Sequence, residues 1–299
     1  MQKITPHLWF DKEAKEAAEF YVSTFPQSKI TSITTLHDTP SGSADVLAFE
    51  LLGREFQAIS AGPYFQFNPS VSFHVICRTK DEVDAIWTRL AEGGTVLMEL
   101  GEYPFSDRFG WVQDRYGLSW QISSTGRADT KQNIMPALMF VGSVSGKAEE
   151  AIRFWISVFR EGKVDAIQHY GPGEEPDREG TLRYATFSLL GQEFSAMDSA
   201  HEHRFAFNEA ISFVVNCDTQ KEIDYYWRQL SAVPEAEQCG WLKDKYGLSW
   251  QIVPSGMGEL LAGDDPARTA RVTQAFLQMK KIDVAQLQEV ARGESAPAR

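Results

Sequence analysis

A nine-residue segment that occurs twice constrains the fold of this chain more than any other feature of its sequence. The first copy reads DRYGLSWQI, from Asp114 to Ile122, and the second reads DKYGLSWQI, from Asp244 to Ile252. Other segments recur in the same order: ITPHLWF with IMPALMF, LLGREF with LLGQEF, and FQFNPSVSFHVIC with FAFNEAISFVVNC. A chain that repeats itself over most of its length builds two copies of one structural unit.

The extent of the repeat predicts the domain organisation. We expect one domain over residues 1–126 and a second over residues 134–256, joined by a polar linker at 127–133. The length of 299 residues is sufficient for two domains of ordinary size. Residues 257–299 have no counterpart in the first copy, and the pair Asp265-Pro266 followed by apolar residues at helical spacing predicts a tail of helices.

Each copy has the same predicted order of elements. Residues 4–10 alternate between two faces as in a strand, apolar residues from Ala14 to Phe25 recur at helical spacing, and three strand-like runs follow. The cycle restarts at Val71, and Thr79 with Glu82 forms a capping box at the start of the next helix. The predicted fold class is therefore α+β, with two modules of strand, helix and three strands in each domain.

Composition excludes several classes of function. The net charge is −12 and the chain contains no basic run, so no nucleic-acid partner is expected. The three cysteines lack Cys-x-x-Cys spacing, which argues against a disulfide framework or a zinc knuckle. The start has no signal segment and no window is apolar enough to span a bilayer, so we expect a cytoplasmic protein without a membrane partner.

The repeated segment predicts a hairpin with one polar face. Aspartate at the first place and glycine at the fourth place of DRYG favour a tight turn. On the strand that leaves the turn, Leu118, Trp120 and Ile122 share one face, and Ser119 and Gln121 share the other. If helices cover the apolar face of a curved sheet, the glutamine lines its hollow side, which we call a cup.

These modules resemble the vicinal-oxygen-chelate superfamily, which includes glyoxalase I, extradiol dioxygenases and fosfomycin-resistance proteins. More narrowly, SF-x-V-x-C, CGWLKDKYGLSWQIVP and the D-P-A-R of the tail resemble the PhnB-like family, which is described as 3-demethylubiquinone-9 3-methyltransferase. The resemblance covers both domains and the tail, and it implies curved mixed sheets that form cups. The chain has no glycine-rich strand-to-helix loop of the kind that holds a nucleoside cofactor, so methyl transfer is the weakest function that the resemblance implies.

The same resemblance implies positions for a divalent metal, which the superfamily holds in the cup on His, Gln or Glu side chains. In the first copy these positions fall on Thr5 or His7, Ser72 or His74, Gln121, and Gln57 or Ile59. In the second copy they fall on Ala137, Ser212 or Val214, Gln251, and Ser195 or Met197. Metals of this kind prefer anionic or imidazole ligands, so no metal is the expected state, and His7, His74 and Gln121 are the candidates if one is bound.

The sequence leaves open how the modules pair. If they pair within a domain, His7 and His74 share one cup. If they pair across the domains, His7 faces Ser212 and Gln251, while His74 and Gln121 face Ala137 and Met139. In the second arrangement the two histidines do not meet and cannot bind one metal.

Two functions fit these residues. The first is binding or sequestration of a small molecule in cups lined by hydroxyl, amide and aromatic groups, contributed by Thr5, Trp9, Gln57, Ser72, Ser119, Gln121, Ser195, Ser212, Ser249 and Gln251. The alternative is an enzyme acting on a small oxygenated or quinone-like substrate, with His7 or His74 as catalytic base, alone or beside a metal. We expect a monomeric pseudo-dimer, because the fused domains bury the surface through which single-domain relatives would dimerise.

Overall fold

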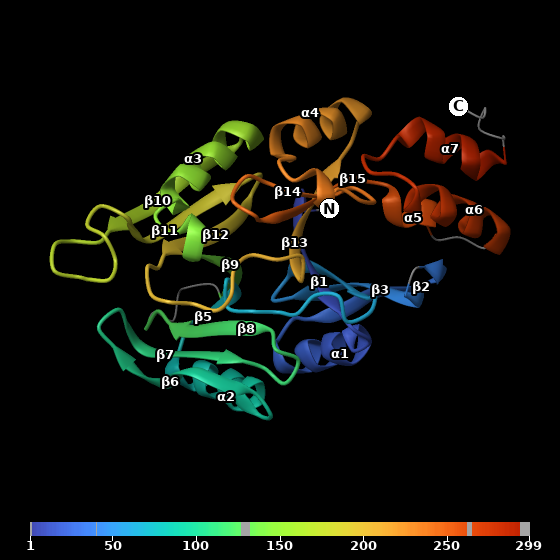
Figure 1. Ribbon diagram of the computed structural model, residues 1–299. Coiled ribbons are helices and arrows are strands. Elements are labelled where there is room, and N and C mark those ends of the chain that lie inside the picture. Colours follow the sequence, from blue (N-terminus) through green and yellow to red (C-terminus); the bar gives the residue numbers. More distant parts are fainter. Residues whose placement is uncertain (1, 40, 127–131, 262–264, 294–299) are drawn as a thin grey trace.

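A computed structural model describes residues 2–39, 41–126, 132–261 and 265–293, which form four modules followed by a helical tail (Figure 1). The first module consists of β1 (Ile4–Phe10), α1 (Ala14–Thr24), β2 (Lys29–Thr39), β3 (Gly42–Leu51) and β4 (Arg54–Ser60). The second consists of β5 (Val71–Cys77), α2 (Lys80–Ala91), β6 (Thr95–Tyr103), β7 (Ser106–Gln113) and β8 (Ser119–Ser124). The third consists of β9 (Asn133–Phe140), α3 (Ala148–Phe159), β10 (Gly162–His169), β11 (Leu182–Leu189) and β12 (Gln192–Asp198).

The fourth module is shorter than the prediction of three strands after every helix. It contains β13 (Ile211–Cys217), α4 (Gln220–Leu230), β14 (Trp241–Lys243) and β15 (Ser249–Pro254), so it has one strand fewer than the other modules within the described ranges. The reason is visible in the sequence, because the second copy lacks the stretch at 94–106 that forms β6 and its turn.

The predicted tail of helices is confirmed. It consists of α5 (Met257–Leu261), α6 (Pro266–Leu277) and α7 (Val284–Arg292). Asp265 caps α6 by accepting hydrogen bonds from the backbone N–H groups of Ala267 and Arg268. No helix in the described ranges is long and apolar enough to cross a membrane.

Each of the two sheets combines one module from each repeat. The seven-stranded sheet has the order β14-β15-β13-β1-β4-β3-β2, and the eight-stranded sheet has the order β10-β11-β12-β9-β5-β8-β7-β6. β1 pairs antiparallel with β13, which places His7 opposite Ser212. β5 pairs antiparallel with β9, which places Ser72 opposite Ala137. The modules therefore pair across the repeats, which is one of the two arrangements that the sequence left open.

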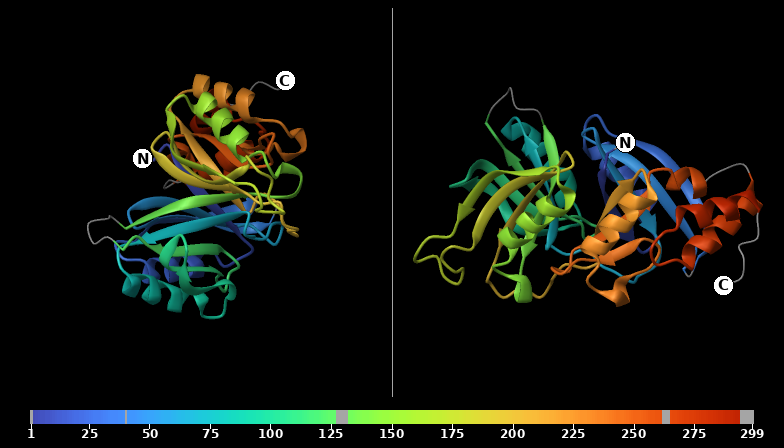
Figure 2. Two further views of the ribbon diagram at one scale, coloured as in Figure 1. Left: turned by 90° about the vertical axis from the view of Figure 1, so that its left-hand side faces the viewer. Right: turned by 90° about the horizontal axis from the view of Figure 1, so that it is seen from above.

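Although the sheets are shared, the aromatic residues of each repeat pack mainly against one another. In the first repeat, the rings of Tyr21 and Phe25 each lie 5.2 Å from the ring of Trp120. In the second repeat, Phe159 lies 5.2 Å from Trp250, the equivalent tryptophan. Figure 2 shows the two repeats as two layers that the antiparallel strand pairs connect. Each repeat thus joins its two modules through a core, and the sheets join the repeats.

The aspartate explains why the doubled segment has the same spacing in both repeats. Asp114 Oδ1 accepts hydrogen bonds from two backbone N–H groups of its own turn, and Asp114 Oδ2 accepts from Trp120 Nε1 and from the Tyr21 hydroxyl, both at 2.8 Å. Asp244 has the same role in the second repeat, with Trp250 and Trp155 as donors. Burial raises the pKa of both carboxyl groups. The segment therefore has a structural role, because its buried aspartate holds the hairpin against the core by hydrogen bonds.

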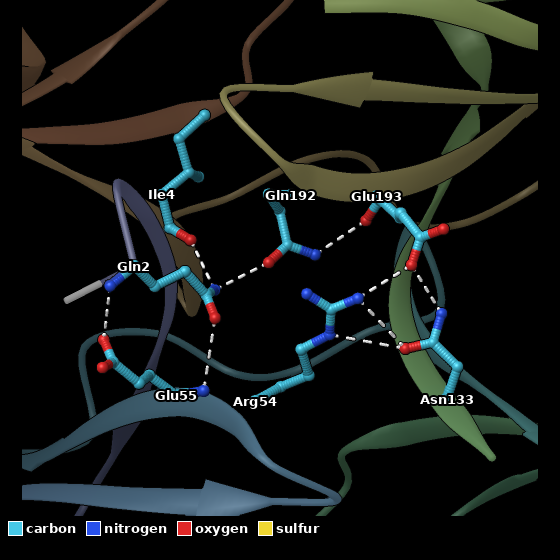
Figure 3. Close-up of polar contacts among 7 residues, drawn as sticks. All are labelled: Gln2, Ile4, Arg54, Glu55, Asn133, Gln192 and Glu193. Atoms are coloured by element: carbon cyan, nitrogen blue, oxygen red, sulfur yellow. Dashed lines mark hydrogen bonds and ion pairs between the residues drawn. The ribbon is translucent and has the colours of Figure 1, made fainter. Parts of the chain in front are cut away.

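A polar junction connects the first and third modules where their strands begin (Figure 3). Gln2 Nε2 donates to Gln192 Oε1 at 2.7 Å, and Arg54 forms an ion pair with Glu193 at 2.8 Å. Asn133 Nδ2 also donates to Glu193, while Glu55 accepts from the backbone N–H of Gln2. The two carboxylates that recur in the motif G-x-E-F therefore serve the contact between the repeats.

Candidate functional site

Two concave faces remain after the helices of the modules are placed. On the seven-stranded sheet, α1 contacts β3 and β4, and α4 contacts β13 and β15. On the eight-stranded sheet, α2 contacts β7 and β8, and α3 contacts β11 and β12. Strand register then defines the side chains on each opposite face. We call the opposite face of the seven-stranded sheet the His7 cup and that of the eight-stranded sheet the His74 cup.

A row of side chains on neighbouring strands forms the floor of the His74 cup. Strand register places them in the order Met98, Trp111, Gln121, His74 and Met135. The adjacent row, in the same direction, is Gln113, Ser119, Ser72, Ala137 and Ser195. The groups in both rows are amide, hydroxyl, thioether, imidazole, indole and the methyl of Ala137, so this floor carries no formal charge when the histidine is neutral.

The polar groups of this floor are linked by hydrogen bonds. Ser119 Oγ accepts from Trp111 Nε1 at 2.8 Å and lies 2.9 Å from Ser72 Oγ. His74 Nε2 lies 2.8 Å from Ser123 Oγ. Burial lowers the pKa of the partly buried His74 to about 4, so its imidazole is neutral at pH 7. The cup can therefore exchange hydrogen bonds with a ligand without presenting an ion.

An aromatic rim borders the His74 cup. The rings of Tyr103 and Phe105 stack with centroids 5.5 Å apart, and Phe105 contacts Phe109 at 5.0 Å. Phe109 in turn lies 6.5 Å from the ring of His74. Phe105 is 67% exposed, so the rim presents a large apolar ring to solvent. We name these three residues, Tyr103, Phe105 and Phe109, the aromatic rim.

The aromatic rim was not predicted from the sequence, although a signal for it was present. Tyr103 and Phe105 belong to the stretch GTVLMELGEYPFS, which the first copy has and the second lacks. A stretch present in only one copy of a repeat cannot be required for the shared fold. It is therefore the natural place to look for a feature that distinguishes the two cups.

The His7 cup is more enclosed. His7 lies between Gln57 and Ser212 in the register, and Ser249 and Lys243 continue the same row. Gln251 Nε2 donates to Ser212 Oγ at 2.9 Å. The tryptophan rings of Trp9 and Trp241 lie 5.9 Å apart, and Trp241 lies 5.4 Å from His7.

Two polar groups of the His7 cup are deeply buried. His7 is 5% exposed and Thr5 is 1% exposed. Thr5 Oγ1 and His7 Nδ1 have no hydrogen-bond partner among the described residues. Burial lowers the pKa of His7 to about 3, so this imidazole is also neutral at pH 7. Such unpaired buried atoms are rare in folded proteins and mark a place where a bound molecule could gain hydrogen bonds.

The structure divides the residues expected to line a pocket between the two cups. The His7 cup holds Thr5, His7, Trp9, Gln57, Ser212, Ser249 and Gln251, and the His74 cup holds Ser72, His74, Ser119, Gln121 and Ser195. Gln121 is the register partner of His74, but His7 belongs to the other sheet, so the set His7, His74 and Gln121 is not brought together. Among the described residues, no group of three or more His, Cys, Asp or Glu side chains could hold a metal ion.

Comparison with solved structures defines the class of fold. Glyoxalase I from Zea mays matches 86% of this chain and 96% of its own chain, with 14% sequence identity and a TM-score of 0.51. This likeness establishes a tandem glyoxalase fold and, at that identity, nothing about the reaction. A search of curated proteins found no match.

The family follows from the sequence. The family model for 3-demethylubiquinone-9 3-methyltransferase matches residues 2–123 and again residues 132–253, and the chain belongs to this family. A PhnB protein from Bacillus cereus, described as a 3-demethylubiquinone-9 3-methyltransferase, is 41% identical over 42% of this chain and 100% of its own, with a TM-score of 0.39. A protein from Staphylococcus aureus is 29% identical over 41% of this chain and 95% of its own, with a TM-score of 0.18.

Proposed function

We propose that the protein binds a small, uncharged, planar aromatic molecule in the His74 cup. The observation that carries this proposal is the neutral pair His74 and Gln121, placed among aromatic and thioether side chains and bordered by the exposed aromatic rim. A neutral imidazole, an amide and hydroxyl groups orient a ligand by hydrogen bonds, while rings and methionine sulfurs favour a flat apolar body. A charged ligand would lose hydration and find no counter-ion on this floor.

Binding measurements with matched probes test the proposal. We expect isothermal titration calorimetry to detect 2-naphthol, and to give affinities at least roughly tenfold weaker for cyclohexanol, which cannot stack, and for 2-naphthoate, which is charged. Phe105→Leu should weaken 2-naphthol binding about two- to tenfold, because it removes a ring contact from the aromatic rim. Tyr64→Leu is the matched control, since Tyr64 is an equally exposed ring (64%) that contacts Trp9 of the other cup. Unchanged affinity in both Phe105→Leu and His74→Ala would refute the assignment of the site.

We also propose that binding does not require a metal. Each cup offers one imidazole beside side-chain amides and hydroxyls, and neither floor row contains a carboxylate. Divalent metals at protein sites are held by several imidazole, thiolate or carboxylate ligands, which this donor set does not supply.

Elemental mass spectrometry on protein purified without a histidine tag tests this point. We expect far less than one metal per chain, and no rise in melting temperature with Zn, Mn, Ni or Fe(II). Near-stoichiometric metal that is lost in His7→Ala or His74→Ala would contradict the proposal and direct substrate screening to vicinal dioxygen compounds.

A second candidate is an enzyme that uses His74 as a base. The contact of 2.8 Å between His74 Nε2 and Ser123 Oγ favours it, because a histidine in that position can take the proton of a hydroxyl nucleophile. The low pKa of His74, about 4, makes it a weak base, and for that reason binding ranks first. Hydrolysis of p-nitrophenyl acetate that Ser123→Ala and His74→Gln both abolish would support the enzyme.

Methyl transfer, which the family description names, is the third candidate. The sequence supplies no glycine-rich strand-to-helix loop for a nucleoside cofactor. We expect S-adenosylmethionine to leave the melting temperature unchanged. A rise of several degrees at millimolar cofactor would place methyl transfer ahead of simple binding.

A further inference from the structure

The C-terminal helices lie across the His7 cup. At one edge of the seven-stranded sheet, α6 contacts β2. At the opposite edge, the backbone N–H groups of Cys239 and Gly240 donate to the carbonyl oxygens of Met279 and Lys280, both at 2.7 Å. Val214 and Val253, which strand register places on the concave face, pack against the tail, so the tail covers part of that face. In Figure 2 the red tail accordingly lies beside the blue strands of the first module.

The tail docks through a small hydrophobic cluster that is separate from the main core. The sheet contributes Val214 and Val253, and the tail contributes Met257, Val272, Met279, Ile282 and Leu287. Val214 is the register partner of Thr5, so the cluster reaches the buried polar end of the cup. Polar contacts to α4 complete the attachment, because Gln220 bonds to the backbone of both Ile282 and Val284.

The contact between tail and body is incompletely packed. A pocket of about 400 Å³ lies along it, with Thr219 and Gln220 at the start of α4 on one side and Leu260 and Val284 of the tail on the other. The pocket is open to solvent, so the tail does not pack against the body along its whole length. A segment held by its own small cluster beside such a pocket can separate without unfolding the core to which it docks.

The polar groups beneath the tail are not satisfied by it. Thr5 Oγ1 and His7 Nδ1 lack partners among the described residues, and so does Thr269 Oγ1 of α6, which lies one helical turn before Val272 and Thr273. Val214, which packs in the tail cluster, is the register partner of Thr5, so the tail borders the unpaired Thr5 hydroxyl without satisfying it.

We infer that the helices α5 to α7 form a lid over the His7 cup, which undocks to admit a small uncharged molecule that hydrogen-bonds to Thr5 and His7. The lid stands where the His74 cup has its aromatic rim, because Cys239, which bonds to the tail, is the repeat equivalent of Phe109. The two cups then differ in access, one open and one gated. This inference is independent of the ligand proposed for the His74 cup.

Chemical modification of His7 measures the opening of the lid in the full chain. Diethyl pyrocarbonate is a small uncharged reagent that modifies neutral imidazole, and peptide mass spectrometry resolves each histidine. In wild type we expect slow modification of His7 and fast modification of the exposed His37. Val272→Ala with Leu287→Ala removes two fully buried anchors of the tail and should accelerate modification of His7 by at least about tenfold, with His37 unchanged.

Two further variants separate lid opening from general instability. Val83→Ala truncates a buried residue of α2 in the main core, and it should leave modification of His7 slow. Met279→Cys places a second thiol beside Cys239, where a disulfide would lock the lid and suppress modification of His7 until a reductant is added. Counting free thiols shows whether this disulfide has formed. If it has not, the loosened variant, Val272→Ala with Leu287→Ala, still tests the inference.

Two results would overturn the inference. One is modification of His7 in wild type as fast as that of His37. The other is a rate for His7 that is unchanged in the loosened variant, or that rises equally in Val83→Ala.

Discussion

Single buried polar residues are of two kinds, in the hairpin turns and on the strand faces. Asp114 and Asp244 are fully paired, each with four donors, and they hold their hairpins to the core. Thr5 and His7 are equally buried but carry unpaired atoms. Period-two alternation predicted that Thr5 and His7 share one face of their strand. It could not predict which cup, since alternation fixes the face of a strand and not its neighbours.

The paired group predicts a stability effect. Asp244→Asn keeps one acceptor and turns an NH₂ group toward donors, so we expect the free energy of unfolding in urea at pH 7 to fall by about 2 to 4 kcal/mol. Asp165→Asn, on the exposed strand β10, is the control and should change it by less than about 0.5 kcal/mol. Equal effects of the two substitutions would show that the four hydrogen bonds contribute nothing particular.

The buried histidine predicts a dependence on pH. The folded-state pKa of His7, about 3, lies below the ordinary value of 6.5, so the unfolded chain binds more protons between these pH values. The stability associated with neutral His7 is therefore complete above pH 6.5 and is lost as the pH falls toward 3. Between pH 7.5 and 4.5 we expect wild type to lose about 2 to 3 kcal/mol more than His7→Gln in urea denaturation. Parallel curves for the two proteins would contradict the burial of a neutral imidazole, and His37→Gln is the exposed control.

At the scale of elements, local patterns predicted most of the helices and strands. Periodicity and capping located α1, α2 and α4, and Asp265-Pro266 located the start of α6. The short fourth module was not predicted in its strand number, because the three-strand pattern was carried over from the first copy. Nor did the sequence predict where the tail docks. An apolar stripe shows that one face of a helix is buried, but it does not show which element covers that face.

A close approach between two elements predicts the effect of one methyl group. A Cβ at Gly110 of β7 would lie 2.4 Å from an atom of the Trp87 ring of α2. Gly110→Ala should therefore push α2 away from the sheet and lower the free energy of unfolding by about 1 to 3 kcal/mol. Gly101→Ala is the matched control on the neighbouring strand, where the nearest atom is 3.8 Å away. A loss in the control as large as that in Gly110→Ala would point to strand propensity instead of packing.

At the scale of the whole molecule, the repeat predicted two units but not the exchange of modules between them. The strands β5 and β13 share the pattern SF-x-V-x-C, so each could pair with β1 as far as sequence shows. The choice depends on contacts across most of the chain, which local sequence patterns do not encode. His7, His74 and Gln121, the candidates named in case a metal is bound, are not brought together for this reason, because His7 belongs to the other sheet.

The shared sheets predict the behaviour of half the chain. The isolated repeat 1–126 would leave β1 paired only with β4 and β5 paired only with β8, so each strand would have one free edge, and β5 of a second copy can take the place of β13. We expect light scattering to give the mass of a dimer for this fragment, whereas the full chain pairs the same strands internally. A folded monomer of the fragment, judged by its circular dichroism, would argue against this equivalence of strands.

Pairing across the repeats also determines the order in which strands can pair while the chain is being synthesised. Ile4 pairs with Val215, so the first strand must wait for a partner made about 210 residues later. At translation rates of about 5 to 20 residues per second, that interval lasts roughly 10 to 40 seconds. During it β1 is a bare edge, and Pro6, which lacks an N–H, and Lys3 at its start discourage wrong pairing. We therefore expect substitutions at these two residues to lower the yield of correctly folded protein during synthesis more than they lower the stability of the folded protein.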